Sequence, residues 1–342
     1  DMSPGLVGAP LLSAMSANTT ALPTVETSVA RRRAWDWGIE KFIYLSSLVA
    51  IAIIVLIFLF VGREALPVLT SPQVHEEVTL STMFLPQNYG TPEAPLPYVW
   101  QPVGLHPKYS VMPLLLGSLK ATLIAMLFAT PLALLAAIYT TEFAPRRMRE
   151  VIKPVIEMLA GIPSVVLGFF ALIVLATVLQ DLFDLEYRLN AINAGIALGL
   201  AVIPIVYTIC EDALTAVPRS YRNASLALGA SPWQTAWKVV LPSALPGVFA
   251  GIVLGFGRAI GETMIVLMAS GNAAITSWNF AEPVRTLSAS IAAELGEVVF
   301  GSPHYHVLFF LGVMLFVITF TVNWIGTIAV SRLRKRLAGA DR

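Results

Sequence analysis

The chain has 342 residues, of which 56% are hydrophobic and 13% are charged, and its formal net charge at pH 7 is +1. Soluble domains carry about 25% charged residues, so half that share excludes an ordinary water-soluble enzyme, a disordered chain and a nucleic-acid-binding protein. A single cysteine, Cys210, excludes an internal disulfide framework and a cysteine-rich metal site. The composition therefore predicts an all-α, polytopic helical protein whose main surroundings are membrane lipid.

The N-terminal part contains a tail and one membrane span. Residues 1–33 are rich in Ser, Thr, Ala and Pro and are expected to form a disordered cytoplasmic tail. The sequence begins at Asp1 rather than Met, as expected of a trimmed chain or of part of a longer product. Residues 34–110 should hold a first transmembrane helix at 42–61 and then a long outside loop. That helix is too long and too deep in the chain for a signal peptide.

Five further spans are expected between residues 111 and 330, because each has about the 20 mostly apolar residues that cross a bilayer. They lie at 112–139, 155–179, 191–210, 247–270 and 307–330. Closely spaced glycines within them, such as Gly195 and Gly199, are interpreted as positions where helices pack closely. The outside loop before the last span should contain a short amphipathic helix at 287–295.

Basic residues near the span ends predict the orientation, because cytoplasmic loops carry an excess of Lys and Arg. Sixteen of them fall on one side: Arg31, Arg32, Arg33, Lys41, Arg146, Arg147, Arg149, Lys153, Arg219, Arg222, Lys238, Arg332, Arg334, Lys335, Arg336 and Arg342. Four fall on the other side: Arg63, Lys108, Arg188 and Arg285. Both termini, including a basic tail at 331–342, are therefore expected in the cytoplasm, as six spans require.

The cytoplasmic loop at 211–242 has the signals of two short helices joined by a tight turn. Residues 219–228 can form the first helix, and Gly229 favours its end because glycine tolerates the left-handed conformation. Ser231 is a suitable N-cap for the second helix, with Pro232 at its first position and Gln234 completing a capping-box pattern. Such an elbow can dock a partner protein, or it can be a simple interfacial connector.

This loop resembles the EAA loop of binding-protein-dependent ABC importer permeases: Glu-Ala-Ala, three residues, Gly, nine residues, Ile, one residue, Leu-Pro. The matching positions here are Asn223, Ala224, Ser225, Gly229, Val239, Leu241 and Pro242. Asn223 stands where the family has Glu, so it keeps hydrogen-bonding capacity but lacks the charge. The stretches 160–170 and 257–264 are similar to the third and fifth spans of phosphate-specific ABC importer permeases, and more to the C-type than to the A-type subunit.

The resemblance covers residues 114–330 and implies a type I ABC importer permease fold in a bacterial inner membrane. It further implies a second permease that completes the translocation path, ATPase subunits docked at the 211–242 loop, and an extracytoplasmic phosphate-binding protein. No Gly-x-x-x-x-Gly-Lys-Ser/Thr sequence is present, so this chain is not expected to be an enzyme or to bind a cofactor. ATP would be used by the partner subunit.

Two cations, Lys120 and Arg258, lie at membrane depth, where a charge is costly and usually faces a polar path. Glu262 follows Arg258 by four residues, so both can lie on one helix face. Arg258 can attract an anion while Glu262 orients, releases or gates it, or the two can form a structural ion pair. A guanidinium suits phosphate because its planar fork donates two hydrogen bonds. Lys120 can join the same path or extend to the surface, and Thr263 can offer a further donor.

Other functions remain to be weighed. Sulfate and molybdate need donors similar to those for phosphate. An autonomous channel or a secondary carrier is less favoured, because neither an acidic ring nor a clear duplication is legible. A serine hydrolase pairing Ser164 with His304 or His306 is disfavoured, because the membrane would separate them. The two histidines also lack a third metal ligand in the sequence pattern.

Overall fold

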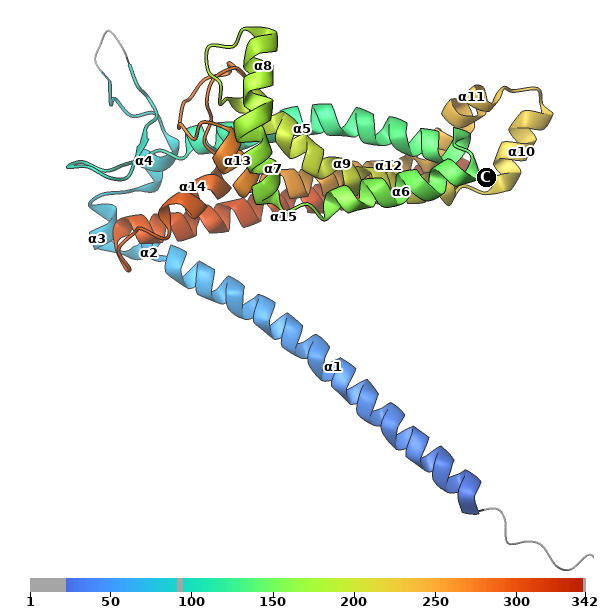
Figure 1. Cartoon of the computed structure of the whole chain (residues 1–342). Helices are drawn as coiled ribbons and strands as arrows, with labels where there is room; N and C mark the ends of the chain where they lie inside the picture. The colour runs from blue at the N-terminus through green and yellow to red at the C-terminus, as the bar shows by residue number, and fades with distance from the viewer. Residues whose placement is uncertain (1–22, 91–94, 341–342) are drawn as a thin grey trace, which may run out of the picture. The chain divides into compact units, whose positions relative to one another are not determined.

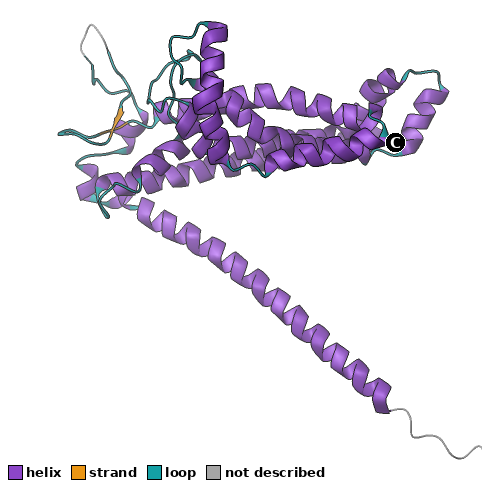
Figure 2. Ribbon diagram, in the orientation of Figure 1, coloured by secondary structure: helices purple, strands orange, loops and turns teal. Residues whose placement is uncertain are grey.

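The computed structural model describes residues 23–90 and 95–340, and most of this part is helical (Figure 2). Residues 1–22 of the expected tail lie outside the described residues, whereas residues 23–33 are helical. The chain divides into two compact units, Asp1–Phe60 and Val61–Arg342. The first unit contains most of helix α1 (Pro23–Ala65), a single helix of 43 residues.

Six helical segments of the described chain are long and apolar enough to cross a membrane. They are Trp35–Thr70, Met112–Phe143, Ser164–Phe183, Ala191–Thr215, Pro232–Gly261 and Pro303–Lys335. The prediction of an all-α protein with six spans is thereby confirmed. Two of the predicted spans have the wrong boundaries, as described below.

In the second unit, the segment predicted as a long outside loop contains several short elements. Three short helices come first: α2 (Pro67–Thr70), α3 (Pro72–His75) and α4 (Leu80–Phe84). Proline begins α2 and α3, where no amide donor is missed. Strands β1 (Trp100–Gln101) and β2 (Lys108–Tyr109) then form an antiparallel pair in which Trp100 faces Tyr109.

The second and third spans are separated by an amphipathic helix. Helix α5 (Met112–Ile138) continues as a π-helical turn, η1 (Tyr139–Phe143), and α6 (Arg146–Ala160) follows. The third span comprises α7 (Ser164–Phe170), the π-helical turn η2 (Ala171–Leu175) and α8 (Ala176–Phe183). The prediction of a continuous span at 155–179 was wrong. Pro163 disfavours helical geometry at the residue before it and supplies no amide proton, so the helix ends at Ala160 and restarts at Ser164.

The fourth and fifth spans enclose the predicted elbow. Helix α9 (Ala191–Thr215) leads to α10 (Arg219–Ala227), α11 (Pro232–Thr235) and the π-helical turn η3 (Ala236–Val240). Helix α12 (Leu241–Gly261) continues directly from η3, and α13 (Met264–Ala269) follows a break. The fifth span therefore starts fifteen residues before the predicted residue 247 and is interrupted at Glu262. The last elements are α14 (Leu287–Glu294), which confirms the predicted short helix, and α15 (Pro303–Ala340).

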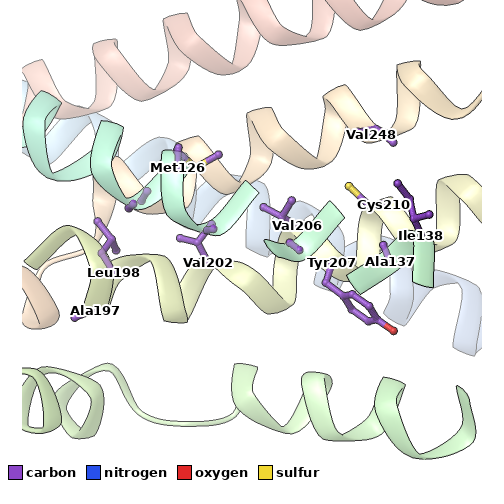
Figure 3. Packing of buried hydrophobic residues seen from close by; sticks show 14 of the residues in the cluster. Met126, Ala137, Ile138, Ala197, Leu198, Val202, Val206, Tyr207, Cys210 and Val248 are labelled. Atoms are coloured by element: carbon purple, nitrogen blue, oxygen red, sulfur yellow. The ribbon is translucent and has the colours of Figure 1, made fainter. Parts of the chain in front are cut away.

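The main core lies among α5, α9 and α12, and Figure 3 shows its side chains. Labelled members are Met126, Ala137, Ile138, Ala197, Leu198, Val202, Val206, Tyr207, Cys210 and Val248. Small residues allow this packing: a Cβ on Gly195 would lie 2.5 Å from Ile124, and one on Gly255 would lie 2.6 Å from Val206. The interpretation of these glycines as close-packing positions is confirmed.

A second hydrophobic cluster joins the 61–110 segment to the start of α5, to α14 and to α15. Its buried members include Val68, Val74, Val78, Met83, Trp100, Tyr109, Leu114, Leu287, Val307, Leu308 and Leu311. Within the second unit, Figure 1 places α10 and α11 at one end of the helix bundle and α2–α4 at the other. The elbow and the 61–110 segment therefore belong to opposite ends of the spans.

Candidate translocation and coupling sites

The fifth span breaks next to the charged residues that the sequence singled out. Arg258 lies in the last turn of α12, and its side chain is exposed in the single chain. A cation is favoured at a helix C-terminus because the unpaired carbonyls there carry partial negative charge. Within the described residues, Arg258 makes no ion pair and no hydrogen bond. Its guanidinium is therefore available to a ligand or to a partner chain.

Glu262 is bonded elsewhere and does not pair with Arg258. Its backbone is extended (φ −70°, ψ 136°), so it has left α12. Its Oε1 accepts the amide protons of Thr263 and Met264 at 3.1 and 3.2 Å. The expectation that Arg258 and Glu262 share a helix face or form a structural ion pair is thus corrected, because the helix ends between them.

The break adjoins an open pocket of about 480 Å³ formed by Thr263, by α14 with the residues after it, and by α15. Its lining is mostly apolar, and it consists of Thr263, Ser288, Ile291, Ala292, Leu295, Gly296 and Leu315. The Ser288 hydroxyl donates a hydrogen bond of 2.8 Å to the Glu262 carbonyl, which ties α14 to the break. Thr263 lies at this pocket, and its hydroxyl has a weak 3.4 Å contact with the Gly261 carbonyl.

Lys120 occupies a different environment from the one expected. Its side chain is buried, and Nζ donates to the carbonyls of Ser277 and Asn279 at 3.1 and 2.6 Å. The ammonium also lies 5.8 Å from the centroid of the Phe280 ring. Lys120 therefore neither extends to the surface nor joins Arg258, and it holds the loop at 271–286 against α5.

The elbow has the local geometry that its sequence predicts. Gly229 adopts the left-handed conformation (φ +85°) directly after α10. Ser231 caps α11, with its hydroxyl accepting the Gln234 amide at 3.2 Å and the Gln234 side chain accepting the Ser231 amide at 2.9 Å. Ser225 and Thr235 share a hydroxyl–hydroxyl bond of 2.9 Å that joins the two helices. The elbow is thus a defined structural unit and not an irregular linker.

The elbow presents apolar side chains and a groove at its surface. Leu228 is 90% exposed and Trp233 is 58% exposed, and Asn223, Ala224 and Gly229 are exposed as well. The groove has a volume of about 550 Å³ and is lined by Tyr221, Ala224, Ser225, Leu228, Ala230, Gln234, Lys238 and Val239. Leu241 and Pro242, the last residues of the motif, form the first turn of α12, so they position the elbow and lie outside its groove.

Two ion pairs near the elbow were not anticipated. Arg222 pairs with Glu142 of η1 at 2.7 Å, and Lys153 of α6 pairs with Glu211 of α9 at 2.7 Å. The hydrogen bond from Lys153 to Glu211 raises the pKa of Lys153 despite partial burial. The members of these pairs lie 80 and 58 positions apart, so no local sequence pattern indicates that they meet. The only signal in the sequence was the cluster of basic residues on this side.

A polar cluster lies at the opposite end of the spans, around Glu294. Its carboxylate accepts hydrogen bonds from Trp100 (3.0 Å) and His304 (2.9 Å) and pairs with Arg285 (2.5 Å). Burial by itself would raise the pKa of Glu294, but these hydrogen bonds and the charge of Arg285 hold it below its usual range. The cluster joins the 61–110 segment to α14 and α15.

The histidines considered for hydrolysis or metal binding have other partners. His304 is bonded to Glu294, and the Nδ1 of His306 lies 2.8 Å from the Glu64 carbonyl. Across residues 23–90 and 95–340 there is no group of three or more His, Cys, Asp or Glu side chains suited to a metal ion. The geometry thus gives these histidines structural contacts at the ends of the spans.

Comparison with known proteins agrees with this architecture. Residues 129–335 match the family model of the binding-protein-dependent transport system inner membrane component. A probable ABC transporter permease, YqgH of Bacillus subtilis, is 37% identical over 221 residues, which cover 65% of this chain and 72% of YqgH. The phosphate transport system permease PstC of Xylella fastidiosa is 33% identical over 256 residues, which cover 69% of this chain and 78% of PstC.

A solved structure supports the fold. A bacterial alginate ABC transporter, solved with an alginate-bound periplasmic protein, contains a chain that superposes with a TM-score of 0.57 at 14% identity. The match covers 88% of this chain and 98% of that one. The arrangement of spans is therefore that of type I ABC importer permeases. This chain belongs to the family of binding-protein-dependent transport system inner membrane components.

Proposed function

We propose that this chain is the C-type permease subunit of an ATP-driven phosphate importer in a bacterial inner membrane. The observation that carries the proposal is the exposed guanidinium of Arg258, which has no partner within residues 23–90 and 95–340. It lies at the broken end of a span, in a chain with PstC relatives. A second, similar permease would cover this face and close the path. The low dielectric there would strengthen the attraction between Arg258 and an oxyanion.

Glu262 would complement Arg258 without neutralising it. Its carboxylate is held by the amides of Thr263 and Met264, close to the proposed path. We propose that Glu262 repels the anion from the break and so favours its release from Arg258. Thr263 adjoins the same break and would supply a further hydroxyl donor.

The elbow would carry the coupling to ATP hydrolysis, while ATP itself is bound by the partner subunit. The exposed surface around Asn223, Ala224 and Gly229, with the adjoining groove, would receive an ATPase subunit. Ser225 would hold α11 against α10, and Leu241 and Pro242 would pass the movement into α12. The excess of basic residues supports a cytoplasmic location for the elbow, both termini and the tail at 331–342.

Other oxyanions remain the alternative substrates. Sulfate and molybdate also present oxygen acceptors to a guanidinium, and the binding protein would set most of the selectivity. The alternative is tested by the same assay, with each anion supplied together with its own binding protein. A channel or secondary carrier would work without an ATPase, whereas this chain should be inactive alone.

The decisive experiment is uptake of radiolabelled phosphate by the complete complex reconstituted in vesicles. Arg258→Gln should abolish uptake while the complex still assembles, because glutamine keeps a polar side chain but removes the charge. Arg332→Gln, at an exposed position of α15, is the matched control and should transport normally. Normal phosphate uptake by Arg258→Gln would overturn the role of Arg258. Uptake of sulfate or molybdate in place of phosphate would overturn the assignment of phosphate as the substrate.

A further inference from the structure

The elbow is joined to the second span by an arginine that pairs with a carboxylate. Arg222 of α10 donates from Nη2 to Oε1 of Glu142 at 2.7 Å, and its Nε lies 3.2 and 3.1 Å from the two carboxylate oxygens. Both side chains are largely buried, with 19% and 10% of their surfaces exposed. Such a multiply bonded guanidinium–carboxylate pair fixes orientation as well as distance.

The same guanidinium closes the end of the fourth span. Arg222 donates to the carbonyls of Leu214 and Val217 at 2.8 and 2.5 Å, and these carbonyls lie at and just after the C-terminus of α9. Helix ends leave such carbonyls without intrahelical partners. One side chain therefore joins three elements: the elbow, α9 and η1.

The π-helical turn η1 receives further contacts on both sides. Its Phe143 ring lies 6.0 Å from the ring of Trp233 in α11, so adjacent residues of η1 touch both helices of the elbow. Arg149 of α6 donates to the carbonyls of Thr140 and Thr141. A π-helical turn displaces carbonyls from the regular helical ladder, so they are open to such donors.

Helix α5 continues from this junction to the opposite end of the spans. There Lys120 binds two carbonyls of the 271–286 loop, and the Ser118 hydroxyl accepts the amide of Leu287 at 3.0 Å. The 271–286 loop follows α13 directly, and α13 follows the break at Glu262. A displacement of η1 would thus reach the loop beside the candidate path through one continuous helix.

We propose that Arg222 and Glu142 are positioning residues that join the coupling elbow rigidly to α5, so that ATPase movement reaches the outer loop. The inference rests on the proposed function only in taking the elbow as the ATPase contact. Neither residue touches the transported anion. Neither residue lines the groove that would receive the ATPase, and both line a separate pocket that also includes Asn223 and Pro232.

The test measures the distance between the elbow and α5 in the complete complex. Spin labels on Ser220 of α10 and Leu135 of α5, both exposed, report their separation with and without ATP. In the wild type this separation should keep one narrow distribution through the ATP cycle. In Arg222→Lys and Glu142→Gln it should broaden, because a lysine cannot bond both carboxylate oxygens and two carbonyls together.

Transport supplies the second readout. Phosphate taken up per ATP hydrolysed should fall about tenfold in either variant, while the ATPase remains bound. The double variant should be no worse than the single ones, because the two residues act as one unit. Arg146→Gln is the matched control, since the Arg146–Glu150 pair is exposed (92% and 63%) and should leave both readouts unchanged.

The outcomes separate the two proposals. Unchanged label distances and an unchanged uptake ratio in both variants would overturn the inference. Loss of the ATPase from either variant would overturn it as well, because the pair would then serve assembly. Absence of phosphate uptake by the wild type would reject the proposed substrate, while the label distances would still decide the role of the pair.

Discussion

At the scale of single residues, the close approach of two backbone segments constrains which residue can be present as strictly as charge does. A Cβ on Gly117 of α5 would lie 2.2 Å from the carbonyl oxygen of Arg285, and a backbone atom cannot swing aside as a flexible side chain can. The loop at 271–286 can therefore approach α5 only because residue 117 has no side chain. No spacing rule identifies this glycine, because its neighbour is 168 positions away.

Gly117→Ala should consequently destabilise the protein, by about 1–3 kcal/mol as is usual for overpacking. Thermal unfolding of the purified chain in detergent measures the effect. Gly62→Ala is the control, because nothing lies within 4 Å of a Cβ there and alanine favours the helix. Equal midpoints for the two variants would contradict the proposed close approach.

The Glu294 cluster predicts a pH dependence at the end of the spans opposite the elbow. Its carboxyl pKa is lowered in the folded state, so the ionised group stabilises the fold above the usual carboxyl pKa of about 4.3. That contribution is lost as the pH falls through the lowered value. Glu294→Gln should therefore lower the thermal midpoint at neutral pH, and the difference from the wild type should shrink at acid pH.

The matched control for this titration is Glu297→Gln, because Glu297 is exposed on the same segment. Its midpoint should follow the wild type throughout the pH series. If the thermal midpoint of Glu294→Gln stays below that of the wild type by the same amount at every pH, then packing, and not the charge of Glu294, accounts for the effect.

At the scale of elements, the elbow is the part that local sequence describes best. Its cap, turn and helix starts follow from neighbouring residues, and each adopts the predicted geometry. The third and fifth spans were predicted less well, because hydropathy averages over a window. It does not register the proline that separates α6 from α7 or the break at Glu262, where the carboxylate bonds the following amides.

The turn at Gly229 yields a prediction that separates conformation from contact. A β-branched residue in the left-handed region costs about 1–2 kcal/mol or more, whereas Asn tolerates it. Gly229→Val should misplace α10 and release the ATPase, while Gly229→Asn should keep the turn. Co-purification of the ATPase with each variant measures the outcome. Loss of the ATPase from both variants would show that the docking surface has no room for any side chain at position 229.

At the scale of the whole molecule, the ends of the second unit should face different compartments. Native Cys210 is buried, so added cysteines can be labelled selectively. An impermeant maleimide should label Leu105→Cys, near the β1–β2 hairpin tip, from outside the cell, because Leu105 is 97% exposed. Ser220→Cys in the elbow should react only in inverted vesicles. The reverse pattern would contradict the orientation.

The sequence by itself determined the membrane-spanning character, the number of spans and the local geometry of the elbow. These properties depend on composition and on residues within one or two turns of each other. Only the tertiary structure decided which partners the charged residues have: Lys120 binds loop carbonyls, Arg222 pairs with Glu142 across 80 positions, and Arg258 has no partner among the described residues. The physical reason is that a buried charge is stabilised by whatever acceptors the packed helices bring to it, and neither helix period nor hydropathy specifies which distant segment supplies them.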